Sequence, residues 1–289
     1  MIDTGLKNKI VLITGVNNPY GIGAATARAF IAEGTTVFVT YLRLPAEAST
    51  TNLPGEAFYH VQNARTADEV ITAIRERGGK IEAWEADLAD PVIIPQLFDR
   101  VERAFGPVDI LINNAAHCDP DTFIPRSQLG SDSRAVDEFP MSTITADKHD
   151  RHFAVNSRAV ALMMAEYARR YIERGASWGR IINVSTDGAS GFNSEVSYGA
   201  SKHALESYSR AAASELGKYG ITVNTVSLGA VQTGWISPEL EKEEASHIPL
   251  QRVGRPEDVA DVIIFFASEQ ARWVTGQLLY VGGGHVMPL

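Results

Sequence analysis

The chain has 289 residues, of which 45% are hydrophobic and 21% charged, and it contains a single cysteine, Cys118. These values suit a globular protein with a substantial core and argue against a disordered, collagen-like or disulfide-rich chain. Its 26 basic and 35 acidic residues give a net charge of −9, a poor match for nucleic acid or an anionic membrane. The N-terminus lacks a basic region followed by a long apolar run, so we expect a cytoplasmic protein without signal peptide or membrane span.

Short, nearly continuous apolar runs alternate with helical stretches along the chain. This alternation predicts an α/β fold, with a doubly wound parallel sheet covered by helices on both faces. No linker or repeat divides the chain, so we expect a single domain over residues 1–289. The expected strands are Ile10–Ile13, Val37–Thr40, Lys80–Glu85, Asp109–Ile112, Arg180–Val184, Ile221–Val226 and Leu278–Val281, and the expected helices are Ala24–Glu33, Thr66–Arg77, Pro95–Ala104, Ala154–Arg174, Ser201–Lys218 and Glu257–Ala267.

Two segments depart from this alternation. Residues 44–77 begin with a stretch that contains two prolines and little apolar periodicity, and residues 117–149 are polar and also contain prolines. Long connections in a compact domain are usually functional or mobile. We interpret both as insertions that bear on substrate choice, with solvated surface loops as the alternative.

A glycine-rich turn joins the first strand to the first helix, in the segment TGVNNPYGIG at residues 14–23. Glycine permits the unusual backbone angles of such a turn and lets a phosphate approach the backbone, and the following helix N-terminus attracts negative charge. Directly after an N-terminal strand, the turn predicts a Rossmann-type dinucleotide site, although a plain tight turn would also use glycine. The candidate contacts are Gly15, Asn17, Tyr20, Gly21, Ile22 and Gly23.

The end of the second strand bears on the choice of dinucleotide. An acidic side chain there binds the ribose hydroxyls of NAD and repels the 2′-phosphate of NADP. The segment VFVTYLR at residues 37–43 contains no Asp or Glu, and Arg43 could pair with a phosphate. We therefore expect NADP(H), with NAD as the less favoured alternative and a plain surface role for Arg43 as the competing interpretation.

A tyrosine and a lysine stand four residues apart at the start of a helical stretch, so Tyr198 and Lys202 project from one helix face. The phenol has an ordinary pKa of about 10. We expect the lysine ammonium, together with an oxidised nicotinamide ring, to lower that pKa. A hydroxyl at the end of the preceding strand could stabilise a substrate oxygen.

At this point the sequence resembles the short-chain dehydrogenase/reductase superfamily over nearly its whole length. The matching segments are TGVNNPYGIG at 14–23, DL at 87–88, NNAA at 113–116, VN at 155–156, GRIINVS at 179–185, YGASK at 198–202, ITVNTVSLGAVQTGW at 221–235 and TGQLLYVGGG at 275–284. Within the superfamily it is most similar to bacterial 3-oxoacyl-(acyl-carrier-protein) reductase-type proteins, a label shared by enzymes with many substrates. The related enoyl reductases space their Tyr and Lys more widely.

The resemblance implies roles for individual residues. Tyr198 would be the general acid/base, Lys202 would bind the nicotinamide ribose, and Asn156 would hold a water that links Lys202 to solvent. The catalytic hydroxyl is Ser185 when counted back thirteen residues from Tyr198, which we favour, and Thr186 when counted from GRIIN. The remaining cofactor contacts would be Asp87, Leu88, Asn114, Ala115, Ala116, Gly229, Val231 and Thr233.

The resemblance therefore predicts hydride transfer between NADP(H) and a carbonyl compound or secondary alcohol, in a homodimer or homotetramer. The alternatives are an NAD-dependent alcohol dehydrogenase and a dinucleotide-binding scaffold without turnover. The sequence departs from the family pattern in having five residues between Gly15 and Gly21 instead of three, Ala116 in place of glycine, and Leu228 in place of proline. We expect no metal site and no nucleic-acid or membrane partner.

Overall fold

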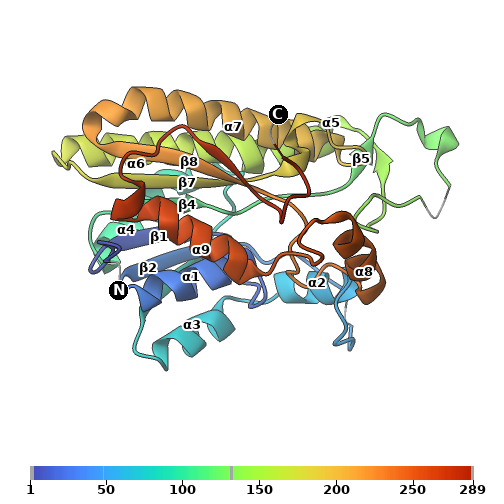
Figure 1. The fold of residues 1–289 in the computed structure, drawn as a ribbon, viewed down its shortest axis with the longest axis horizontal. Helices are drawn as coiled ribbons and strands as arrows, with labels where there is room; N and C mark the ends of the chain where they lie inside the picture. Colours follow the sequence, from blue (N-terminus) through green and yellow to red (C-terminus); the bar gives the residue numbers. More distant parts are fainter. Residues whose placement is uncertain (1–2, 48, 131–132, 288–289) are drawn as a thin grey trace.

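Seven parallel strands form the central sheet, in the order β3–β2–β1–β4–β7–β8–β9. The computed structural model describes residues 3–47, 49–130 and 133–287 (Figure 1). The strands are β1 (Ile10–Thr14), β2 (Thr36–Tyr41), β3 (Lys80–Glu85), β4 (Ile110–Asn113), β7 (Gly179–Thr186), β8 (Ile221–Leu228) and β9 (Leu278–Val281). This sheet confirms the expected doubly wound α/β fold.

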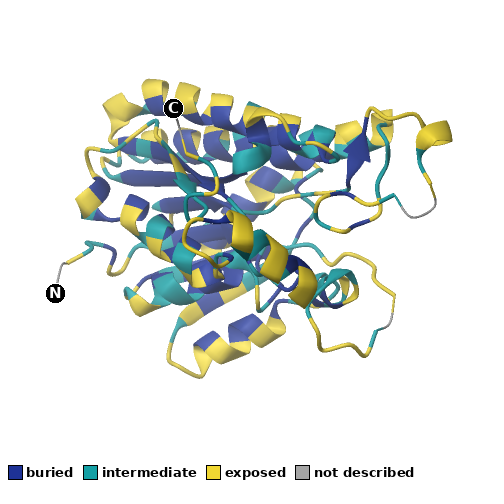
Figure 2. Cartoon of the chain, turned by 45° about the vertical axis from the view of Figure 1, so that its right-hand side comes forward, coloured by how far each residue is buried: buried dark blue, intermediate teal, exposed yellow. Residues whose placement is uncertain are grey.

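Three helices cover each face of the sheet (Figure 1). Because successive strand residues face opposite sides, Val11 and Ile13 of β1 pack with α1, α3 and α9, whereas Leu12 packs with α4, α6 and α7. Figure 2 shows the result, with the sheet buried and the outer faces of the helices exposed. The covering helices are α1 (Ile22–Ala32), α3 (Asp68–Arg75), α4 (Ile93–Ala104), α6 (Val160–Glu173), α7 (Val196–Leu216) and α9 (Pro256–Ala267).

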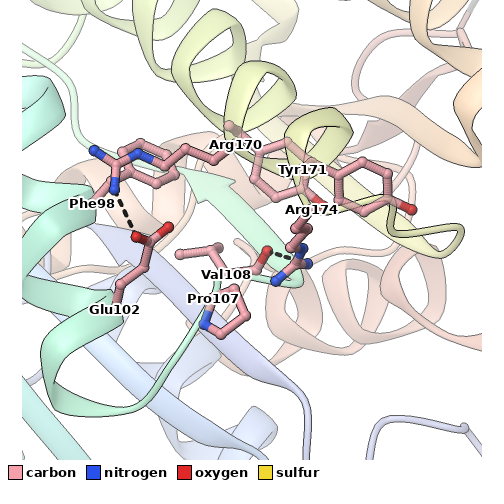
Figure 3. Close-up of a pocket in the computed structure, with 8 residues that line it drawn as sticks. Phe98, Glu102, Pro107, Val108, Arg170, Tyr171 and Arg174 are labelled. Carbon is pink, nitrogen blue, oxygen red and sulfur yellow. Dashed lines mark hydrogen bonds and ion pairs between the residues drawn. The ribbon is translucent and has the colours of Figure 1, made fainter.

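Arginine side chains fasten α6 to α4 and to the start of β4 (Figure 3). Arg170 donates to Glu102 at 2.8 Å and lies over the ring of the buried Phe98, and Arg174 donates to the carbonyl oxygen of Val108 at 3.0 Å. This contact lies at the amino-terminal end of β4. Ligands of open α/β sheets bind at the opposite, carboxyl end of the strands, so the small pocket drawn in Figure 3 belongs to helix packing.

The longer connections gather at the carboxyl ends of the strands (Figure 1). They contain α2 (Glu56–Asn63), β5 (Asp121–Thr122), β6 (Ser142–Thr143), α5 (Ala146–Phe153) and α8 (Pro238–His247), with β5 and β6 paired as a separate two-stranded sheet. The expected elements did not include α2 and α8. The start of α8 has a sequence signal, because Ser237 caps it by accepting from the Leu240 N–H and Pro238 occupies its first turn.

The helix expected over residues 154–174 is longer and is interrupted. It begins as α5 at Ala146, passes through a π-helical turn at Ala154–Ala159 and continues as α6. A π-helical turn widens the helix locally and often marks a functional site. Asn156 lies in this turn.

Candidate active site

The turn after β1 has room only for glycine at two positions. Gly15 has a φ of +77°, and a Cβ on it would lie 2.8 Å from the Cα of Ala115. A Cβ on Gly23 would lie 2.3 Å from the carbonyl oxygen of Gly15. The side-chain amide of Asn114 donates to that same oxygen at 3.0 Å. The turn after β1 and the segment after β4 are therefore packed backbone to backbone.

This turn lies where the strand order reverses, between β1 and β4, which is the usual ligand crevice of a doubly wound sheet. Helix α1 starts here behind Gly21, and no side chain caps its first N–H groups. Free N–H groups at a helix N-terminus bind anions. The glycine turn and the start of α1 thus fit the pyrophosphate of a dinucleotide.

The asparagines of the lengthened turn hold neighbouring segments. The amide of Asn17 donates to the carbonyl oxygens of Asn63, at 2.8 Å, and Arg65, at 3.1 Å. The amide of Asn18 donates to the carbonyl oxygen of Thr233 at 3.0 Å, which brings the segment after β8 to the same place. The side chain of Asn17 therefore fastens the first insertion, and its role as a cofactor contact stays a prediction.

Arg43 is paired with an acid that sequence reasoning did not place at this position. Its Nε lies 2.9 and 3.0 Å from the two carboxyl oxygens of Glu85, and its Nη2 lies 2.9 Å from one of them. The register of β2 and β3 sets Tyr41 beside Glu85. The hydrogen bonds from Arg43 hold the pKa of Glu85 below its ordinary value. An acidic group therefore does lie at the end of β2, contributed by β3.

The other expected cofactor contacts surround the glycine turn. Asp87 accepts two bonds from Arg151 of α5, at 3.0 and 3.2 Å. Tyr20 is half exposed, with its ring centroid 5.3 Å from that of Phe58 in α2. The rest follow the carboxyl ends of β1, β3, β4 and β8 and are Ile22, Leu88, Ala115, Ala116, Gly229, Val231 and Thr233. Their individual roles stay predictions.

The ammonium group of Lys202 is buried under the end of β7. Its Nζ donates to the carbonyl oxygen of Val184 at 2.8 Å and lies 5.8 Å from the ring centroid of Tyr198. Lys202 is 1% exposed, and this burial lowers its pKa to about 8. A group with such a pKa can gain and lose a proton near neutral pH.

The phenol of Tyr198 remains protonated in this environment. Burial raises its pKa well above the ordinary value, and the Cys118 thiol and the Glu195 carboxyl raise it further. We expected Lys202 and a nicotinamide ring to lower the pKa of Tyr198. The groups of the chain itself raise this pKa instead. The protonated phenol is the form that can give a proton to a developing alkoxide.

The two candidate hydroxyls at the end of β7 have different partners. The Ser185 hydroxyl is buried and donates to Glu206 of α7 at 2.7 Å. It faces the same side as Asn183, whose amide also reaches α7. Thr186 follows on the other side, and its Oγ1 accepts from the Gly188 N–H at 3.3 Å. Among the described residues, no acceptor takes the proton of this hydroxyl. The spacing from Tyr198 thus favoured the residue whose hydroxyl is already engaged.

Asn156 is fully buried, and its amide is satisfied by the chain. The amide oxygen accepts from the His117 N–H at 2.8 Å, and the nitrogen donates to the His117 carbonyl at 2.8 Å and to the Ser201 hydroxyl at 2.9 Å. Asn156 therefore fastens the start of the second insertion to α7, next to Lys202. Its water-holding role stays a prediction.

Three groups near Tyr198 form a cluster that the sequence did not predict, and two of them, Asp137 and Glu195, were not singled out at all. The sulfur of Cys118 and one carboxyl oxygen each of Asp137 and Glu195 lie within 4.8 Å of one another. Glu195 is 4% exposed, and burial, followed by the charge of Asp137, raises its pKa to about 8. A usable sequence signal was its position three residues before Tyr198, which is close to one helical turn.

Comparisons with known proteins agree with this fold. The family described as enoyl-(acyl carrier protein) reductase matches residues 55–285. An uncharacterized oxidoreductase of Bacillus subtilis, YjdA, is 31% identical over 283 residues, which cover 97% of this chain and 98% of that protein. A 3-oxoacyl-[acyl-carrier-protein] reductase of Synechocystis is 30% identical over 286 residues, which cover 98% of this chain and 99% of that protein. A solved short-chain dehydrogenase/reductase of Serratia marcescens is 28% identical with a TM-score of 0.76, covering 97% of this chain and 98% of its own.

The chain is thus an oxidoreductase of the class that binds a nicotinamide dinucleotide. It belongs to the short-chain dehydrogenase/reductase superfamily, which confirms the resemblance seen in its motifs. Among the residues that the structure describes, no helix is long and apolar enough to cross a membrane.

Replacing Lys202 by methionine should stabilise the fold at neutral pH. Burial holds the pKa of Lys202 at about 8 in the folded protein, against about 10.4 for a free lysine. Below pH 8 the folded state carries a buried ammonium at full cost. As the pH rises from about 8 to 10.4 that cost disappears, because the unfolded chain then binds more protons than the folded one. We expect Lys202→Met to be about 1–3 kcal/mol more stable than wild type at pH 7.

Urea unfolding at pH 7 and pH 9.5 measures this difference, with the exposed Lys218→Met as control. The gain in unfolding free energy of Lys202→Met over wild type should be smaller at pH 9.5 than at pH 7. The difference between Lys218→Met and wild type should be the same at both pH values. An advantage of equal size at both pH values would show that the ammonium carries no burial penalty.

Proposed function

We propose that this oxidoreductase interconverts a carbonyl group and a secondary alcohol with NADP(H), and that Tyr198 is its general acid and base. The supporting observation is the protonated Tyr198 phenol beside the buried Lys202, whose pKa is about 8. Gly15, Gly21 and Gly23, with the start of α1, would hold the pyrophosphate. When bound, the nicotinamide supplies or accepts the hydride.

Side chains of the protein carry out the proton transfer and stabilise the substrate oxygen. In reduction, Tyr198 gives its proton to the carbonyl oxygen as negative charge develops there, and the Lys202 ammonium stabilises the phenolate that remains. We assign the catalytic hydroxyl to Thr186, which can donate to the same oxygen, because Glu206 engages the Ser185 hydroxyl favoured from the sequence. Lys202 then gives a proton to the Tyr198 phenolate and regains one from solvent through a water that Asn156 would hold.

Tyr198→Phe should lower kcat about a thousandfold, because it removes the proton donor while keeping the ring. The measurement is NADPH oxidation across a panel of aldehydes and ketones, with NADPH binding followed separately by fluorescence. Tyr208→Phe, at an exposed position of the same helix, is the control and should keep wild-type rates. Unchanged turnover in Tyr198→Phe would refute the mechanism, and a wild type that binds NADPH without turnover would favour the scaffold alternative.

The matched pair Thr186→Ala and Ser185→Ala tests the assignment of the hydroxyl. Loss of one donor to a developing oxyanion costs about a hundredfold or more in kcat, and we expect this for Thr186→Ala. Ser185→Ala leaves the buried Glu206 without that bond, so it should lose about 1–3 kcal/mol of unfolding free energy with only a small change in kcat. The opposite pattern would return the role to Ser185.

The choice of NADP(H) depends on a competition for Arg43. Its ion pair with Glu85 is exposed to solvent and therefore weak, whereas hydrogen bonds from an arginine to a charged phosphate are roughly twice as strong as neutral hydrogen bonds. The 2′-phosphate should therefore displace Glu85. Arg43→Ala should weaken NADPH binding about tenfold with little effect on NADH, and Glu85→Gln should tighten NADPH binding. Tenfold better activity of the wild type with NADH would make the protein NAD-dependent.

A further inference from the structure

The carboxyl group of Glu195 has unused bonding capacity beside the catalytic phenol. It is buried, yet within the described ranges no nitrogen or hydroxyl donates to it. Its partner is the exposed thiol of Cys118, at 3.5 Å, and a thiol is a weak donor. Glu195 precedes Tyr198 by three residues at the start of α7, and both Glu195 and Cys118 act on the pKa of that phenol, so the two groups lie close to it.

The first insertion (residues 44–77) and the second insertion (residues 117–149) contact each other near Asp137. Glu56, at the start of α2, accepts from Arg134 at 2.9 Å, and the ring of Tyr59 lies 6.1 Å from that of Phe139, centroid to centroid. The N–H of Phe139 in turn donates to Asp137 at 3.0 Å, which orients that carboxyl. Figure 1 shows α2 and α8 next to each other at this end of the molecule. The two insertions are thus in contact with each other next to Asp137.

The charged groups that act on Glu195 and Asp137 are acidic. The charged groups that act on Glu195 are Asp137 and Asp121, and those that act on Asp137 are Glu56 and Glu138. A negatively charged substrate group would be repelled here. A plain acyl chain would cover the buried carboxyl without giving it a partner, which costs binding free energy.

We propose that Cys118, Asp137 and Glu195 form a specificity pocket for a hydroxyl group next to the reacting carbon. The substrates are then small, uncharged hydroxy-carbonyl compounds and the polyols derived from them. A hydroxyl both donates and accepts, so it can bond the carboxyl groups and the thiol, which lie within 4.8 Å of one another. This inference rests on the proposed carbonyl–alcohol activity.

The test compares substrates that differ in one group: hydroxyacetone against acetone, with an acetoacetyl thioester as the acyl competitor. Assays contain EDTA, so that a metal ion held by the three groups contributes nothing. We expect kcat/KM for hydroxyacetone to exceed that for acetone and for the thioester by about tenfold or more, because sites built for a hydroxyl reject compounds without one.

Variants of Glu195 show which residue carries the preference. Glu195→Leu should raise KM for hydroxyacetone and bring the ratio between the two ketones close to one. Glu195→Gln, which still donates and accepts, should keep most of the preference. Asp150→Asn, at an exposed position of α5, is the control and should leave the ratio unchanged. If Glu195→Leu does not fold, as judged by circular dichroism, Cys118→Ala is measured for the same loss of preference.

A wild type that uses acetone or the thioester as well as hydroxyacetone would overturn the substrate class. So would a preference that survives in both Glu195→Leu and Cys118→Ala, or one that needs an added divalent cation. These results leave the proposed function intact. If the wild type turns over neither ketone nor thioester and oxidises no alcohol, the proposed function fails, and the inference fails with it.

Discussion

The buried ammonium group of Lys202 determines how helix α7 lies against the carboxyl end of the sheet. A cation removed from water needs a polar partner, and Lys202 finds it in the carbonyl oxygen of Val184. That bond fixes the start of α7 against the end of β7, and with it the place of Tyr198 one helical turn earlier. One hydrogen bond offsets only part of the cost of desolvating a charge. The fold therefore gives up stability to hold an ammonium group with a pKa of about 8 beside Tyr198.

The other parts of the site are attached to this centre by single polar side chains. Asn156, which lies in the π-helical turn, bonds both the backbone of His117 and the Ser201 hydroxyl of α7 and so ties the two together. On the dinucleotide side, Asn17 ties the end of α2, in the middle of the first insertion, to the glycine turn. Each insertion is thus held by one asparagine at the carboxyl end of the sheet, Asn17 in the glycine turn and Asn156 in the π-helical turn. Their composition can vary while their points of attachment stay fixed, which is how one fold serves many substrates.

The five inner strands could be predicted from sequence because they are buried on both faces and therefore appear as continuous apolar runs. The edge strands β3 and β9 are only partly buried, and the expected bounds of Lys80–Glu85 and Leu278–Val281 nevertheless agree with them. Spacing along the chain could not decide between Ser185 and Thr186, because a count does not show which side of the strand a hydroxyl faces. The partner of Arg43 was missed because Glu85 reaches it across the sheet, from a strand 42 residues away. The contact between Arg134 and Glu56 joins residues that are 78 positions apart, so no local sequence pattern could predict it.

The central claim is that hydride passes to a substrate carbon while Tyr198 moves the proton. The most direct measurement uses NADPH with deuterium at both C4 positions of the nicotinamide and follows the label in the alcohol product by mass spectrometry, for wild type and Tyr198→Phe. The account predicts one deuterium on the carbinol carbon in both proteins, with the variant about a thousandfold slower. Unlabelled product, or equal rates in the two proteins, would contradict it.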